Sequence, residues 1–360
     1  MDQMDDMATL EKEGVTMERR TTPAALGMEV VFQENPLLNL SFEGFVDPER
    51  EAQMPPEFKE RIENYKKEHP FVPGEAEKTG HFERFDYTTT VYEDGVTYPK
   101  YCNVYLPAGY DPEDKEKKYN VIYFQHGNTG DPDFFPTPGM KLMLDRLYME
   151  QGIDPCIMVF TTYYFDVTKD VEERRRTGNV PAGDGNYPGV KANFYREITE
   201  DLIPAVESKY NTYLAGTDPE SVKKARDHRL FSGYSRGCVA TWYMIHNAFE
   251  YFRYFIPMSC ITTAGKSIQD PPTDAEIAAY LTAPMKAHPE LPFFIYALNG
   301  GENDIKNMAA QMRVLVDTGV FSFGQDPEKN NFYYAESGYF HGDMFAPQYY
   351  FNALPVMFRG

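Results

Sequence analysis

Residues 227–259 read DHRLFSGYSRGCVATWYMIHNAFEYFRYFIPMS, and this stretch decides the fold. It contains an apolar strand, the turn GYSRG, a helical pattern and a second apolar strand, in the order 229–232, 233–237, 238–249 and 254–258. In a G-x-S-x-G turn the serine sits on a strained elbow, and the residues two before and two after it must be tiny to keep strand and helix apart. The elbow lifts the hydroxyl above the sheet and directs the helix N-terminus at it. We therefore predict Ser235 as a nucleophile; a glycine-rich loop that only ends a strand is the alternative.

Outward from this stretch, short apolar runs alternate with helical segments. Further strands are expected at 85–92, 98–106, 120–125, 156–163, 292–298 and 331–335, and further helices near 139–151, 194–209, 275–281, 305–317 and 347–358. Asp94-Gly95 separates the first two strands, which predicts an antiparallel hairpin with a tight turn. Apolar strands that alternate with helices indicate a mostly parallel sheet covered on both faces. The predicted fold class is α/β, with an antiparallel N-terminal hairpin on a mostly parallel central sheet.

The N-terminal end of the chain has a different pattern. Residues 1–30 are polar and Met-rich, and prolines break the chain just after a short helix-like stretch at 55–69. We expect an N-terminal extension over residues 1–80, partly ordered, followed by one domain over residues 81–360. Residues 1–30 lack the basic and apolar regions of a secretory signal, which favours a cytoplasmic location unless an export signal has been removed.

Composition excludes several classes of function. The 360 residues carry 35 Lys+Arg and 55 Asp+Glu, a formal net charge of −20, and this balance argues against a nucleic-acid or anionic-membrane partner. No apolar run approaches the ~18 residues of a membrane span. The four cysteines show neither a CxxC pair nor metal-ligand spacing, which argues against a disulfide scaffold and a metal site: Cys102, Cys156, Cys238 and Cys260. The oligomeric state stays open.

A serine hydroxyl needs a base, and in hydrolases of this architecture the histidine follows the nucleophile along the chain. Three histidines follow Ser235. His246 lies on the same helix, about 16 Å away at helical rise, and His288 precedes a strand at the opposite end of the sheet. His341 follows the last strand, at the carboxyl edge where open α/β sheets bind ligands. His341 is the predicted base; a loop histidine that caps the next helix is the alternative.

The acid of a Ser-His-acid triad is expected after the preceding strand. Asp304 and Glu302 both follow the strand at 292–298. A carboxylate there would fix the imidazole tautomer and stabilise the imidazolium. Asp304 is favoured over Glu302, and Asp343 is a remote third candidate.

An oxyanion hole needs two backbone N–H groups near the nucleophile. The loop HGNTG at 126–130 ends the strand 120–125, where such a loop belongs. We assign the N–H groups of Asn128 and Arg236, and we expect His126 to order the loop. A glycine-rich turn is the alternative interpretation.

Over about residues 85–358 the chain resembles carbohydrate esterase family one, the feruloyl and acetylxylan esterases of plant cell-wall degraders. The matching segments, in consistent order, are Lys100–Pro112, 126–130, Asn193–Tyr210, Asp227–Ser259 and His341–Phe358. The resemblance implies an α/β-hydrolase fold and a metal-free triad of Ser235, His341 and Asp304, with no cofactor. It also implies a feruloylated or acetylated xylan oligosaccharide as substrate.

Substrate contacts are sought on the catalytic side of the sheet. The connection between Tyr164 and residue 193 is long and carries three consecutive arginines, so it is a candidate lid or binding wall. Arg175 of this triplet is a candidate contact for an acidic sugar substituent, and Tyr164 and Tyr234 are candidates to stack on an acyl group or sugar ring. A solvated arginine run and tyrosines in core packing are the alternatives.

Three functions fit this set of residues. The first is a serine esterase that works through an acyl-enzyme. The second is a catalytically silent carbohydrate-binding homologue, and the third is a thioesterase or acyltransferase with the same triad. The intact serine, histidine and acid favour the esterase.

Overall fold

The computed structural model describes the chain from residue 79, with gaps. The described residues are 79–128, 130–136, 140–141, 144–145, 148, 153–164, 166–177, 190–266, 270–300, 302–324, 326–337, 341–342 and 345–358. The side chains of 174, 175, 177, 190–192, 302–306, 348 and 351 are outside this description. The extension expected at 1–80 therefore lies outside the described residues except for its last two, as does most of the helix expected at 139–151.

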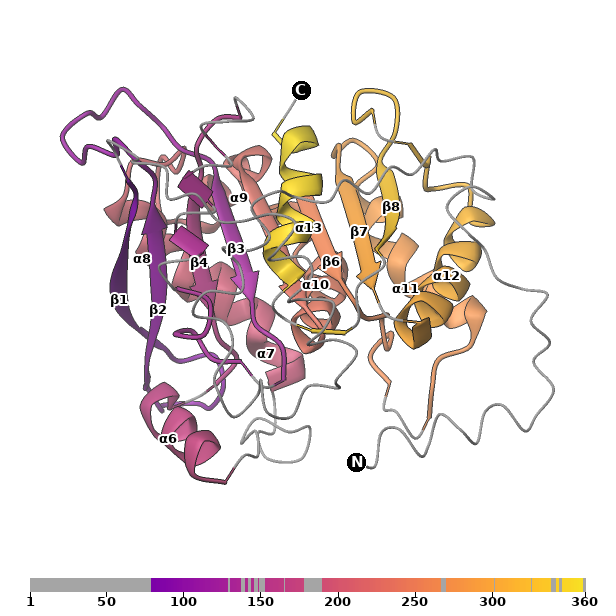
Figure 1. The fold of residues 1–360 in the computed structure, drawn as a ribbon, viewed down its shortest axis with the longest axis horizontal. Helices are drawn as coiled ribbons and strands as arrows, with labels where there is room; N and C mark the ends of the chain where they lie inside the picture. Colours follow the sequence, from indigo (N-terminus) through magenta and orange to yellow (C-terminus); the bar gives the residue numbers. More distant parts are fainter. Residues whose placement is uncertain are drawn as a thin grey trace, which may run out of the picture.

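Eight strands form one sheet in the order β1-β2-β4-β3-β5-β6-β7-β8 (Figure 1). Their bounds are β1 His81–Thr89, β2 Tyr98–Leu106, β3 Val121–Gln125, β4 Ile157–Thr161, β5 Arg229–Tyr234, β6 Tyr254–Met258, β7 Phe294–Gly300 and β8 Phe332–Ser337. The pairs β1–β2 and β2–β4 are antiparallel, and all the other pairs are parallel. This arrangement confirms the predicted α/β class with its antiparallel N-terminal hairpin.

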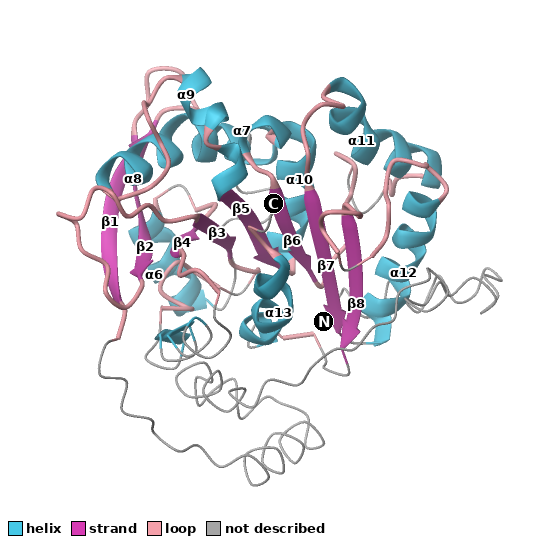
Figure 2. Cartoon of the chain, turned by 90° about the horizontal axis from the view of Figure 1, so that it is seen from above, coloured by secondary structure: helices cyan, strands magenta, loops and turns pink. Residues whose placement is uncertain are grey.

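Helices cover both faces of the sheet. Their bounds are α6 Val167–Thr177, α7 Val190–Arg196, α8 Ile203–Lys209, α9 Pro219–Lys224, α10 Arg236–Asn247, α11 Asp274–Ala287, α12 Glu302–Val316 and α13 Ala346–Ala353. Figure 2 shows α8, α10 and α11 on one face and α13 on the other. Every residue of β3, β4, β5, β6 and β7 is buried, as expected for strands covered on both faces. Among the described residues, no helix combines the length and the apolar character needed to cross a bilayer.

The N-terminal hairpin differs from its prediction at the turn. Thr89 pairs with Tyr98, so residues 90–97 form the connection and the first strand ends before Tyr92. Gly95 takes the positive φ of 77° that its Asp-Gly pair indicates, but inside this longer loop. Tyr92 leaves the sheet because its hydroxyl donates to the buried carboxylate of Glu197. A tertiary hydrogen bond thus overrides the local signal for a tight turn.

The helix expected at 194–209 contains a π-helical segment. Residues Glu197–Leu202 form this segment between α7 and α8. Pro204 lies in the first turn of α8 and has no N–H to donate to the carbonyl four residues earlier, so a regular ladder cannot run through it. A π turn in mid-helix often marks a functional region. Here it turns Glu197 into the protein interior.

Two short helices were not predicted. The first, α6, lies in the long connection after β4. The second, α9, is six residues long, which is too short to show a hydrophobic period. Its start follows from local chemistry, because the Asp218 side chain accepts a hydrogen bond from the Ser221 N–H at 3.1 Å.

The order of the strands reverses between β3 and β5. From β3 the chain crosses to β4 on one side, and it later returns to β5 on the other side of β3. Where the strand order reverses in this way, the carboxyl ends of the two strands border a ligand-binding crevice. The loop after β3 and the turn after β5 therefore face the same site.

Candidate active site

Ser235 occupies a strained elbow between β5 and α10. Its φ is 55° and its ψ is −115°, a conformation that costs a non-glycine residue on the order of 1–3 kcal/mol. The Ser235 N–H donates to the Met258 carbonyl at 2.9 Å, which ties the elbow to β6. The serine makes no side-chain capping bond to α10, so its hydroxyl can face another partner.

Steric crowding explains why both flanking positions of the elbow are glycine. A Cβ on Gly237 would lie 2.0 Å from the Gln125 carbonyl oxygen, at the end of β3. A Cβ on Gly233 would lie 2.3 Å from the Gly237 carbonyl oxygen. Both distances are far below van der Waals contact with backbone atoms that cannot move aside. The spacing of the motif therefore reflects how closely α10 passes β3 and β5.

His341 lies beside the serine. Its Nε2 is 2.9 Å from the Ser235 Oγ, although 106 positions separate them in the chain. His246 instead holds the Tyr280 carbonyl through Nδ1 at 2.7 Å, and His288 lies beside the carboxylates of Glu250 and Glu290. Of the three histidines that follow the serine, the structure pairs only His341 with it among the described contacts.

Tyr234 supports the loop that carries His341. Its ring is fully buried, 5.3 Å from the His341 ring, and its hydroxyl accepts a hydrogen bond from the Gly342 N–H at 2.8 Å. On β5 it stacks parallel to Tyr349 of α13 at 6.1 Å. The sequence predicted Tyr234 as a substrate contact. The ring is buried in this structure, which favours the alternative of core packing, and the substrate contact stays a prediction.

The loop after β3 flanks the elbow. Besides its clash with Gln125, a Cβ on Gly237 would lie 2.9 Å from the His126 carbonyl oxygen, so α10 and this loop are in direct contact. Asn128 is exposed at the tip of the loop. Tyr164 is fully buried, and its hydroxyl donates to the Gly130 carbonyl at 2.7 Å. This contact favours core packing for Tyr164, the alternative to substrate stacking, and the stacking role stays a prediction.

The acid candidates lie in the first turn of a helix. The sequence placed Glu302 and Asp304 in a loop, whereas α12 begins at Glu302 directly after β7. Their side chains are outside the described part of the structure, so the preference for Asp304 stays a prediction. Asp343 and the side chain of Arg175 also lie outside the described residues, while the neighbouring Arg176 is exposed.

A buried charged cluster was missed by sequence reasoning. Lys100 of β2 and Glu197 are fully buried, and the Lys100 ammonium donates to the Glu197 carboxylate at 2.8 Å and to the Thr162 carbonyl at 2.9 Å. Burial lowers the pKa of Lys100, and the Glu197 charge opposes this shift. Tyr87 and Tyr92 also donate to Glu197, and burial together with that charge raises their pKa values. A lysine in a strand is normally expected to be exposed, so no sequence pattern indicated this cluster.

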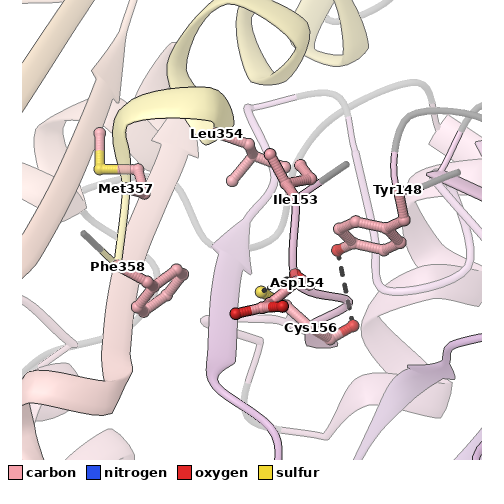
Figure 3. A pocket seen from close by; sticks show the side chains of 7 residues that line it. All are labelled: Tyr148, Ile153, Asp154, Cys156, Leu354, Met357 and Phe358. Carbon is pink, nitrogen blue, oxygen red and sulfur yellow. Dashed lines mark hydrogen bonds between the residues drawn. The ribbon is translucent and has the colours of Figure 1, made fainter. Parts of the chain in front are cut away.

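A cavity of about 120 Å³ lies away from these residues (Figure 3). The end of the chain beyond α13 lines one side of it, with Leu354, Met357 and Phe358. Cys156 lines the other side, directly before β4, and therefore at the sheet edge opposite the Ser235 hydroxyl. Burial raises the pKa of the Cys156 thiol to about 12, which keeps the thiol protonated. This cavity cannot present a substrate to Ser235.

Comparison with known proteins places this chain in a family. The family model described as "Putative esterase" matches residues 99–318, a range that includes Ser235 and Asn128 but ends before His341. The chain is 32% identical over 269 residues to endo-1,4-beta-xylanase Y of Acetivibrio thermocellus, a match that covers 74% of this chain and 22% of that protein. It is 27% identical over 173 residues to an endo-1,4-beta-xylanase/feruloyl esterase of Xylanibacter ruminicola, covering 47% and 21% of the two chains. The chain thus spans about a fifth of the length of these curated relatives.

Solved structures agree with the family match. A serine-to-alanine mutant of the feruloyl esterase module from Clostridium thermocellum, complexed with sinapinate, is 28% identical, with a TM-score of 0.62 over 78% of this chain and 89% of that one. A ferulic acid esterase of Anaeromyces mucronatus is 17% identical, with a TM-score of 0.55 over 80% and 94% of the two chains, and shares the fold. Fold, family model and relatives lead to one conclusion: the chain belongs to this family of serine esterases, within carbohydrate esterase family one.

Proposed function

We propose that this chain hydrolyses feruloyl or acetyl esters on xylan, with Ser235 as nucleophile, His341 as base and Asp304 as acid. The observation that carries the proposal is the 2.9 Å contact between the Ser235 Oγ and the His341 Nε2, on an elbow at the carboxyl edge of the sheet. The similarity to a xylanase, a xylanase/feruloyl esterase and a feruloyl esterase module supports a plant cell-wall ester as substrate. We further propose that residues 81–360 form the esterase domain and that residues 1–80 are an extension outside it.

In the acylation step, His341 Nε2 takes the proton of the Ser235 hydroxyl while the Oγ attacks the ester carbonyl carbon. The carbonyl π electrons move to oxygen, and the resulting oxyanion accepts hydrogen bonds from the N–H groups of Asn128 and Arg236. Arg236 is the first residue of α10, where the helix N-terminus favours negative charge. The C–O bond to the sugar then breaks, and His341 returns its proton to the leaving oxygen.

Deacylation repeats the same steps with water. His341 removes a proton from a water molecule, whose oxygen attacks the acyl-enzyme carbonyl, and the proton returns to Ser235 Oγ as the acid leaves. The role of Asp304 is to hold the imidazole in the tautomer with Nδ1 protonated, so that Nε2 can accept the serine proton.

The choice of acid can be tested by two matched variants. We expect Asp304→Asn to lower kcat by about 10⁴-fold, because an amide favours the wrong imidazole tautomer. Glu302→Gln, in the same turn of α12, is the control and is expected to retain most of the activity. Initial rates of ester hydrolysis measure both. Near-normal rates for Asp304→Asn together with a large loss for Glu302→Gln would transfer the role to Glu302.

The substrate class is tested by a panel of esters with the wild-type chain. We expect methyl ferulate and feruloylated xylan oligosaccharides to be hydrolysed with the highest kcat/KM, followed by acetyl esters. Hydrolysis of acetylated xylan alone would show that the chain acts on acetyl esters and not on feruloyl esters. A preference for thioesters, or transfer of the acyl group to an added alcohol without acid release, would favour the thioesterase or acyltransferase. Binding of xylan without turnover of any ester would favour the silent homologue.

A further inference from the structure

The carbonyl of Gly127, in the loop after β3, is held by three donors. The His126 Nδ1 lies 2.8 Å from this oxygen, the Tyr163 hydroxyl lies 2.9 Å from it, and the Gly130 N–H lies 3.2 Å from it. His126 and Tyr163 are buried, at 1% and 4% exposure, and their rings lie 4.8 Å apart. The oxygen is thus fixed toward the protein interior.

The orientation of one carbonyl also sets the orientation of the next N–H. A trans peptide unit is planar, and its C=O and N–H bonds point in opposite directions. Because the Gly127 oxygen points inward to the two buried rings, the Asn128 N–H of the same peptide unit must point the other way. Gly127 is buried and Asn128 is exposed, which agrees with this orientation.

The contacts also define the protons on His126. A carbonyl oxygen only accepts, so His126 Nδ1 carries the proton that it donates to Gly127. In the neutral ring Nε2 then accepts, and its partner is the Thr162 hydroxyl at 2.8 Å. The Thr162 oxygen in turn accepts from the Tyr164 N–H at 3.2 Å, and the Thr162 carbonyl is held by Lys100. The buried charged cluster therefore helps to hold Thr162, the partner of His126 Nε2, in place.

We propose that His126 and Tyr163 are positioning residues, which lock the peptide between Gly127 and Asn128 so that the Asn128 N–H faces the oxyanion of the reacting ester. This inference rests on the proposed function. Beyond the proposed function, the inference states that two buried side chains that never touch the substrate set the direction of one oxyanion donor. A donor fixed in advance is effective because it needs no reorganisation when charge develops.

Tyr163→Phe tests the proposal most cleanly, since it removes one hydroxyl and keeps the ring. Loss of a whole oxyanion donor costs about 10²–10³-fold in kcat, so we expect a loosened donor to cost about ten-fold. The KM for the ester should change by less than about two-fold, because the ground-state carbonyl carries little charge. The inhibition constant of a trifluoromethyl ketone, which forms a tetrahedral oxyanion on the serine, should rise by about the same factor as kcat falls.

Two other tyrosines provide comparisons. Tyr123→Phe is the matched control: it removes a buried hydroxyl from β3 that bonds the distant Glu207 at 2.8 Å, and it should leave kcat and the inhibition constant unchanged. Tyr164→Phe frees the Gly130 carbonyl in the same loop and should cause a smaller loss than Tyr163→Phe. Equal kcat values for Tyr163→Phe and Tyr123→Phe, or a change in KM alone, would overturn the proposal.

A second pair of variants decides the matter if Tyr163→Phe does not fold. His126→Asn keeps an N–H near the δ position, whereas His126→Leu removes it. We expect the asparagine variant to retain about ten-fold more kcat than the leucine variant at similar KM. Equal rates for the two would contradict the proposal. If the wild-type chain hydrolyses no ester, the proposed function fails; if it does and the variants behave like Tyr123→Phe, only the positioning role fails.

Discussion

Replacing Ser235 by alanine is expected to lower kcat by about 10⁴- to 10⁶-fold, because in the proposed mechanism its hydroxyl forms the acyl-enzyme. His341→Ala should lower kcat to a similar extent, since the serine hydroxyl is not nucleophilic without its base. The double variant should be no slower than either single variant, because residues that act as one unit have non-additive effects. Initial rates with methyl ferulate and p-nitrophenyl acetate measure all three.

The control for this series is Ser232→Ala. Ser232 lies three residues before the nucleophile on β5, is fully buried, and bonds the Tyr123 carbonyl at 3.0 Å. Its removal is expected to reduce stability by about 1 kcal/mol without a comparable loss in kcat. Losses that multiply in the Ser235 and His341 double variant would show that the two residues do not act together, and would contradict the proposed mechanism.

The second large effect concerns the fold of the elbow. Gly237→Ala would place a methyl group 2.0 Å from the Gln125 carbonyl oxygen, against backbone that cannot yield. We expect it to reduce the free energy of unfolding by about 3 kcal/mol or more, at the upper end of overpacking effects. Because α10 must shift to relieve the clash, the Ser235 hydroxyl should also leave His341, and kcat should fall by at least about 100-fold.

Gly216→Ala is the matched control for this prediction. The nearest atoms to a Cβ there belong to the side chains of Ser221 and Asp218, at 3.0 and 3.1 Å, which cap α9, so we expect a loss of at most the cap, about 1 kcal/mol, and no change in kcat. Chemical denaturation and initial rates of both variants give the comparison. A Gly237→Ala chain with wild-type stability and kcat would show that the elbow does not require the close approach of α10 and β3.

The elbow could be predicted because it depends on a strict local rule, and His341 because its place follows from the order of elements along the chain. The space between β3 and α10 admits only glycine at 237, so the residue type itself indicates the close approach. His341 was identified by the order of strands, because the last strand of a parallel sheet ends at the edge that carries Ser235. The nearly continuous apolar sequences of β3 and β4 likewise predict strands that are buried on both faces, as the structure shows.

Features that depend on distant partners were not predictable. Tyr92 lies outside the hairpin strands and donates to Glu197, which is 105 positions away. No local sequence pattern predicts that hydrogen bond. For Tyr164 and Tyr234 the sequence allowed both a substrate contact and core packing, and no local pattern separates the two. The structure shows both rings buried, with hydroxyls that bond the Gly130 carbonyl and the Gly342 N–H. Burial of a residue after a strand depends on packing that the sequence does not display.

The most direct measurement is covalent labelling with a fluorophosphonate reagent, mapped by mass spectrometry of the digested protein. The contact between Ser235 Oγ and His341 Nε2 predicts one rapid adduct, on Ser235, with labelling strongly slowed in His341→Ala. An adduct on another residue, or equal labelling rates in the wild-type and His341→Ala chains, would contradict the claim that this histidine activates this serine.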